Sequence, residues 1–115
     1  MRCINRAVVL VKPRQPFVDW VNAVAFGEDD TPESLEELRK DANAYLFDEM
    51  NDIEDLEEDL KENWLAIFTN EVSDWDEDES KWPELTYKNF RIWFDFNVGT
   101  EVIDLAEEEL FYEEV

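Results

Sequence analysis

The sequence predicts an α+β fold, with a sheet of about three strands and four helices in the order β-α-α-β-α-α-β. Stretches with helical periodicity alternate with short β-branched or alternating stretches. With 115 residues and 44% hydrophobic content, the chain is long and apolar enough for one buried core. It contains no repeat and no linker, so we expect a single domain over residues 1–105 and an acidic C-terminal tail over residues 106–115.

The first half of the chain predicts two strands and two helices. Residues 3–11 end in a run of apolar, mostly β-branched side chains, typical of a central strand covered on both faces, and Pro13 ends this strand. Residues 16–27 begin with a proline, repeat apolar side chains at helical spacing and end at a glycine, which predicts a helix. Thr31 predicts the N-cap of a short second helix, and residues 42–47 alternate as a strand does.

The region from residue 51 to residue 72 predicts the longest helix, with Asn51 and Glu54 as a capping pair at its start. Acidic side chains fill most positions outside its apolar stripe, as expected for a helix with one buried face. The stripe consists of Ile53, Leu56, Leu60, Trp64, Ile67, Phe68 and Val72.

The last quarter of the chain predicts a fourth helix and a third strand. Thr86 is placed to cap a helix whose apolar positions follow at helical spacing. Residues 96–105 alternate between apolar and polar side chains, which predicts a strand, and Gly99 indicates a bulge in it. The apolar positions of the helix are Tyr87, Phe90, Trp93 and Phe94.

The composition excludes several classes of enzyme and cofactor site. Without histidine there is no imidazole base and no Ser-His-Asp triad, and Cys3 alone allows neither an internal disulfide nor a zinc site. Two glycines are too few for a phosphate-binding loop. No apolar run has the length of a membrane span or the pattern of a signal peptide. We therefore expect a cytoplasmic protein without a cofactor and without enzymatic activity.

The charge of the chain indicates the chemistry of its partner. It has 32 acidic and 10 basic residues, for a net charge of -22, which disfavours direct binding to nucleic acid or to an anionic membrane. A basic protein or a cation is the expected counterpart. The acidity also fits an adaptation for solubility or for a salty habitat, so both explanations stay open.

The long helix and the acidic loop that follows it, residues 74–84, supply the candidate binding surface for a basic protein. Charges along the long helix are almost all negative, and like charges at i,i+4 spacing cost a few tenths of a kcal/mol per pair. This excess of negative charge suggests a cationic partner. The loop adds tryptophans, which either anchor an arginine or pack over the core edge. The candidate residues are Glu54, Asp55, Glu58, Asp59, Glu62, Asp74, Trp75, Asp76, Asp78, Glu79 and Trp82.

Mimicry of DNA is the sharper form of this hypothesis. Spread evenly over a domain of this size, the carboxylates come to one per roughly 200 Å², against roughly 110 Å² per charge on duplex DNA. A DNA-mimic inhibitor of a nucleic-acid-binding protein would therefore have to crowd its acids onto one face.

The loop also resembles the start of a calcium-binding loop. Asp74, Asp76 and Asp78 stand at positions 1, 3 and 5, where oxygen ligands converge on the ion. Glu79 replaces the glycine expected at position 6, and Leu85 replaces the glutamate expected at position 12. The three aspartates are accordingly weak candidates for a divalent-cation site, and a solvated loop is the alternative.

Two segments carry a resemblance to known proteins. KPRQPFVDW, residues 12–20, and WFDFNVGTEVIDL, residues 93–105, together resemble a group of small acidic bacterial proteins without an assigned function. The resemblance implies a bacterial, single-domain, cytoplasmic protein, and it implies no particular activity.

Overall fold

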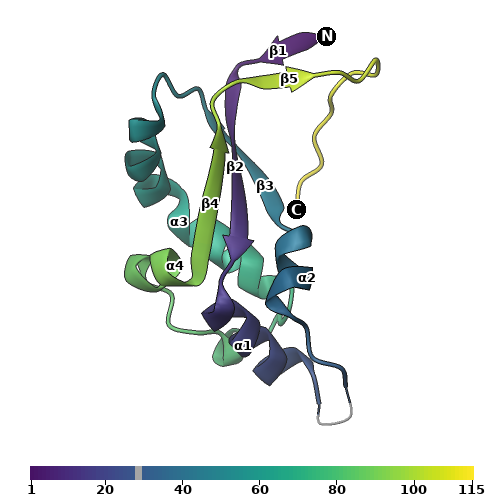
Figure 1. Cartoon of the computed structure of the whole chain (residues 1–115), viewed down its shortest axis with the longest axis vertical. Coiled ribbons are helices and arrows are strands. Elements are labelled where there is room, and N and C mark those ends of the chain that lie inside the picture. Colours follow the sequence, from purple (N-terminus) through teal and green to yellow (C-terminus); the bar gives the residue numbers. More distant parts are fainter. Residues whose placement is uncertain (28–29) are drawn as a thin grey trace.

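Five strands and four α-helices are present in the computed structural model, which describes residues 1–27 and 30–115 (Figure 1). Together they form a single α+β domain, as predicted. The strands are β1 (Arg2–Ile4), β2 (Arg6–Pro13), β3 (Asn43–Asp48), β4 (Phe94–Gly99) and β5 (Val102–Asp104). The helices are α1 (Gln15–Ala25), α2 (Leu35–Lys40), α3 (Leu56–Ser73) and α4 (Tyr87–Trp93), with single 3-10 turns at Ile53–Asp55 and Glu79–Lys81.

The main sheet has the order β3-β2-β4, and both pairings are antiparallel. Side chains along β2 alternate in burial: Ala7, Val9 and Val11 are fully buried, whereas Val8 and Leu10 are only half-buried. The prediction of a central strand is confirmed, but the prediction that it is covered on both faces is wrong. A run of apolar side chains therefore did not distinguish a strand buried on both faces from one buried on a single face.

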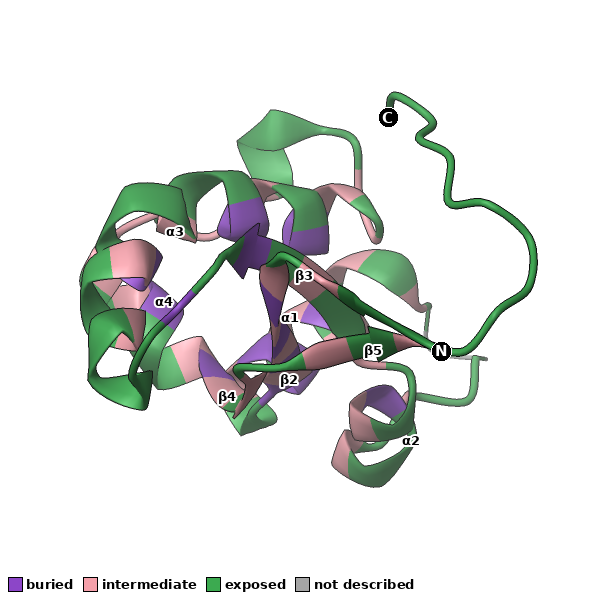
Figure 2. Ribbon diagram, turned by 90° about the horizontal axis from the view of Figure 1, so that it is seen from above, coloured by how far each residue is buried: buried purple, intermediate pink, exposed green. Residues whose placement is uncertain are grey.

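The core lies against the buried face of β2, between the sheet and the helices (Figure 2). Five of the fifteen buried hydrophobic side chains in the described part of the chain are phenylalanines. Helices α1, α3 and α4 each contribute fully or nearly fully buried side chains to it. The ring of Phe68 on α3 lies 5.9 Å from that of Phe90 and 5.6 Å from that of Phe94, in tilted and edge-to-face arrangements. Such contacts add to the stabilisation that burial of the rings provides.

Two predicted strands are each divided in the structure. Residues 3–11 separate at Asn5 into β1 and β2, and residues 96–105 separate after Gly99 into β4 and β5. The outer pieces β1 and β5 pair with each other as a two-stranded ribbon. Gly99 forms no bulge: it pairs with Val8 in regular register, and a Cβ there would come within 3.0 Å of the Val8 side chain. The Val8 side chain packs over this position, and this contact explains the glycine.

The predicted helix caps are partly correct. Thr86 caps α4 as expected, since its Oγ1 accepts from the backbone N of Asn89 at 3.1 Å. Thr31 does not cap α2, because the helix begins three residues later, at another good cap residue, Ser34, whose Oγ accepts from Glu37 N.

The start of the long helix also differs from the prediction. Asp52, and not Asn51, accepts from the backbone N of Glu54, and this contact caps the 3-10 turn that precedes α3. The turn leaves Ile53 outside the apolar stripe, with 60% of its surface exposed. The rest of the stripe is buried or half-buried.

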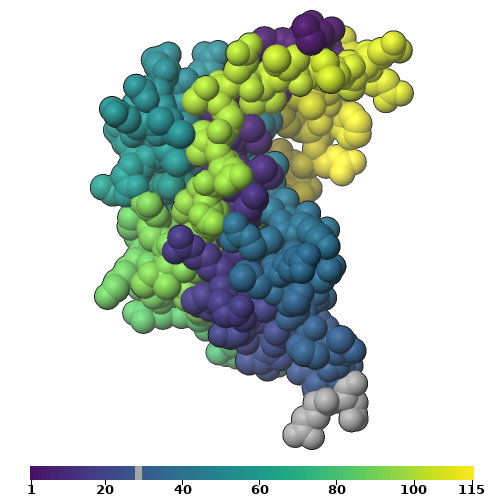
Figure 3. Space-filling view, in the orientation of Figure 1, coloured from purple at the N-terminus to yellow at the C-terminus, as the bar shows by residue number. Residues whose placement is uncertain are grey.

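The C-terminal tail lies outside the body of the domain. Residues 106–115 contain no helix or strand, and all are exposed (Figures 2 and 3). Leu110, Phe111 and Tyr112 are more than half exposed. None of the helices in the described part of the chain is long and apolar enough to cross a membrane.

Candidate functional site

Carboxylates crowd at the N-terminal end of α3. Five of the predicted binding residues lie here, and no ion pair in the described part of the chain involves them. Burial raises the pKa of Asp59, and the nearby charges of Asp55, Glu58 and Asp48 raise it further. Asp48, at the end of β3, therefore belongs to the same cluster. We call this cluster the α3 acidic end; it comprises Asp48, Glu54, Asp55, Glu58, Asp59 and Glu62.

Part of this acidity has a structural explanation. Glu57, Glu58 and Asp59 stand in the first turn of α3, where negative charge is favoured by the helix dipole. Of these three acids, Glu57 has basic and hydroxyl partners: it forms an ion pair with Arg91 of α4 and accepts a hydrogen bond from the Tyr87 hydroxyl. These hydrogen bonds lower the pKa of Glu57. The remaining acids lack such partners among the described residues.

The acidic loop lies at the other end of the same helix. Asp74 follows α3 directly, and the 18 residues of α3 span about 27 Å. Residues 63–70, between the two clusters, contain no acid. The structure thus separates the predicted surface into two acidic patches instead of one continuous face.

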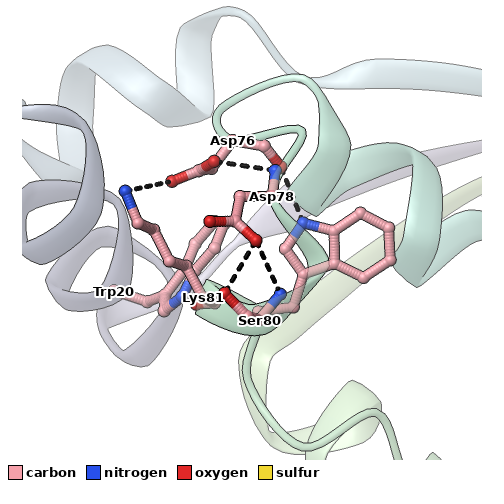
Figure 4. A network of polar contacts seen from close by, with 6 residues as sticks. Trp20, Asp76, Asp78, Ser80 and Lys81 are labelled. Carbon is pink, nitrogen blue, oxygen red and sulfur yellow. Dashed lines mark hydrogen bonds and ion pairs between the residues drawn. The ribbon is translucent and has the colours of Figure 1, made fainter.

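Within the loop, carboxylates are engaged in local contacts (Figure 4). Asp76 Oδ1 accepts from the backbone N of Asp78 at 2.9 Å, and Asp76 Oδ2 lies 3.9 Å from Lys81 Nζ. Asp78 Oδ1 accepts from both the backbone N and the hydroxyl of Ser80, and these hydrogen bonds lower its pKa. Asp74 is exposed at the helix end. In residues 1–27 and 30–115, no group of three or more carboxylate or thiol side chains is placed to hold a metal ion.

The two loop tryptophans are half-buried against the core. The ring of Trp75 lies 6.3 Å from that of Phe26, and Trp82 Nε1 donates to the backbone carbonyl of Asp76 at 2.6 Å. Trp20 Nε1 donates in turn to the carbonyl of Lys81. The tryptophans therefore hold the loop on the domain, and only part of each ring is left for a partner.

A pocket that the sequence analysis missed opens beside this loop. Glu71 on α3 lines it with only 6% of its surface exposed, and its Oε2 accepts from Asn43 Nδ2 and from the Tyr45 hydroxyl, both at 2.6 Å. Burial raises the pKa of Glu71, although the two hydrogen bonds oppose this effect. One signal was present in the sequence: Glu71 lies three residues after Phe68, which places it on the same helix face as the apolar stripe.

Comparisons of this chain with protein-family models, with curated proteins and with solved structures give no match. The resemblance of two segments to small acidic bacterial proteins therefore stays a prediction.

The unpaired carboxylates have a consequence for stability. Six of the acids in the described residues form ion pairs, so most of the negative charge is uncompensated. We expect the melting temperature to rise by several degrees between about 10 and 500 mM NaCl, because screening at these concentrations weakens the repulsion between exposed charges. Thermal unfolding followed by circular dichroism measures this rise, with KCl as a test for effects of one particular salt. A flat or falling curve would contradict the expectation.

Proposed function

We propose that this chain is a small, non-enzymatic interaction protein that binds a basic protein partner. The observation that carries the proposal is the α3 acidic end, where six carboxylates lie together and none forms an ion pair with a described residue. Burial raises the pKa of Asp59 there, and the repulsion from its acidic neighbours raises it further. A cationic partner would relieve this repulsion on binding. The negative field would also steer the partner toward the surface, which mainly increases the association rate.

The density of charge favours this function over mimicry of DNA. The accessible surface of 8189 Å² divided among 32 carboxylates gives one per about 256 Å², whereas duplex DNA has one charge per roughly 110 Å². The two acidic patches at opposite ends of α3 do not combine into one denser face. A partner with separate basic patches suits this arrangement better than a DNA-binding groove does.

Two triple variants with the same change in net charge test the proposal. We expect Asp55→Lys, Asp59→Lys and Glu62→Lys together to slow association with the partner by about tenfold or more at low salt, because they reverse the steering field. The control reverses Glu107, Glu108 and Glu109 in the exposed tail and should have a much smaller effect.

Basic proteins retained by the immobilised chain and released by salt would be purified, and their association rates measured by biolayer interferometry at several NaCl concentrations. Circular dichroism checks that both variants keep the fold. Equal slowing by the two variants would show that only total charge matters. No slowing by either would show that the acidity serves solubility. Loss of a DNA-binding partner's affinity for its DNA in the presence of this chain would favour mimicry instead.

A further inference from the structure

The pocket beside the acidic loop combines negative charge with aromatic walls. It has a volume of about 250 Å³ and lies where β2 ends and β3 begins, between α2 and the C-terminal end of α3. No lysine or arginine of the described residues lines it. The residues that matter for its chemistry are Phe17, Glu33, Asp41, Glu71, Asp74 and Trp75. We call it the Glu71 pocket.

One oxygen of Glu71 is left for a ligand. Both hydrogen bonds that Glu71 accepts go to Oε2, and no described residue donates to Oε1. No fully buried polar side-chain atom of the described residues lacks a partner, so Oε1 still reaches solvent. Since the residue itself is 94% buried and lines the pocket, the pocket is the space into which Oε1 opens.

We propose that the Glu71 pocket binds the cationic head, guanidinium or ammonium, of one arginine or lysine side chain of the basic partner. This inference rests on the proposed function and names the contact by which the partner is anchored. Glu71 Oε1 would accept a hydrogen bond from the cation, while Asp74 and Asp41 supply further negative charge. Trp75 is half-buried and also lines the pocket, and its ring would add a cation–π contact.

The size and chemistry of the pocket favour such a group over other ligands. Pockets for drug-sized ligands measure about 300–1,000 Å³, so this pocket suits a single side-chain head better than a larger molecule. A neutral ligand would leave the charge of a buried carboxylate uncompensated, which is costly. A bare metal ion requires a tighter group of oxygen ligands than the described residues provide.

A titration with small probes tests the pocket without the partner protein. N-acetyl-arginine amide, N-acetyl-lysine amide and the neutral N-acetyl-norleucine amide would be added to the ¹⁵N-labelled chain at constant ionic strength. We expect at least one cationic probe to shift the backbone resonance of Trp75 and the side-chain amide resonance of Asn43 in a saturable way, and the neutral probe to leave them unchanged.

Variants connect these shifts to the carboxylate. Glu71→Gln keeps an acceptor for Asn43 and Tyr45 but removes the charge, and we expect it to weaken binding of the cationic probes by about tenfold. Glu108→Gln in the tail removes the same charge and should bind as the unmodified chain does. If Glu71→Gln folds poorly, Asp74→Asn, at an exposed position, takes its place with a smaller expected loss.

Equal binding of the neutral probe, or unchanged binding by Glu71→Gln and Asp74→Asn, would overturn the inference. A peptide with one arginine between glycines separates the two sources of the cation. Binding of this peptide at least as tight as that of the free amide supports a partner side chain, whereas exclusion of the peptide while agmatine binds would overturn that assignment. Because the α3 acidic end takes no part in these titrations, failure of the pocket to bind the cationic probes can be distinguished from failure of the proposed function.

Discussion

Replacement of Phe68 by alanine is expected to lower the free energy of unfolding by about 3–5 kcal/mol, a large fraction of the stability of a domain this size. Phe68 is fully buried, and the rings of Phe90, Trp93 and Phe94 surround it at centroid distances of 5.6–5.9 Å. Its removal would leave a cavity at the junction of α3, α4 and β4. Urea denaturation followed by far-UV circular dichroism measures the loss.

Leu65 on the same helix provides the control. It has 51% of its surface exposed, so Leu65→Ala should cost less than about 1 kcal/mol. If the two variants lose equal amounts of stability, the face of α3 that carries Phe68 is not the face that packs against the core.

The orientation of α3 was predictable because it depends on local spacing. Side chains three and four residues apart share a helix face, so the stripe through Leu60, Phe68 and Val72 identifies the buried face without any tertiary information. The break at Asn5 and the ends of β4 and β5 were not predictable in this way. They depend on which strands pair, and the β1–β5 pairing joins residues about a hundred positions apart.

In the candidate site, too, features set by local spacing were predictable and features set by tertiary packing were not. The crowding of Asp55, Glu58 and Asp59 follows from helical spacing and was predictable, whereas the contribution of Asp48 depends on where β3 ends relative to α3. The sequence analysis treated the two acidic patches as one surface because the loop follows the helix in sequence. One patch lies at the N-terminal end of α3 and the other follows its C-terminal end, so the length of the helix separates them. Glu71 was not singled out from the 32 acidic residues, although it lies on the same helix face as the apolar stripe and can be distinguished in this way.

Replacement of Tyr45 by phenylalanine is expected to cost about 1.5–3 kcal/mol at pH 7, because it removes a hydrogen bond to a buried carboxylate. The Tyr45 hydroxyl donates to Glu71 Oε2 at 2.6 Å and accepts from Asn70 Nδ2 at 2.9 Å. Burial and the charge of Glu71 raise the pKa of Tyr45, which therefore stays protonated as a donor at neutral pH. Tyr112→Phe in the tail, where the ring is 79% exposed, should cost almost nothing.

The ionisation of Glu71 should also make the stability of the domain depend on pH. Burial raises the pKa of Glu71 in the folded chain above its ordinary value of 4.5. A group of this kind stabilises the fold in full below pH 4.5, and this contribution disappears as the pH rises through the folded-state pKa. Glu71→Gln should therefore be more stable than the unmodified chain at pH 7, by an amount that decreases as the pH falls toward 4.5.

Tyr45→Phe should behave in the opposite sense and over the same pH range. It removes a donor that favours the ionised form of Glu71, so its deficit is largest at pH 7 and shrinks as the carboxylate becomes protonated. In the double variant Tyr45→Phe, Glu71→Gln, no charge remains at position 71, and the pH dependence of the deficit should disappear. Urea denaturation of the four proteins between pH 4.5 and pH 7.5 measures these differences. A deficit that is constant with pH would mean that Tyr45 acts through packing alone and that its hydroxyl does not support an ionised Glu71.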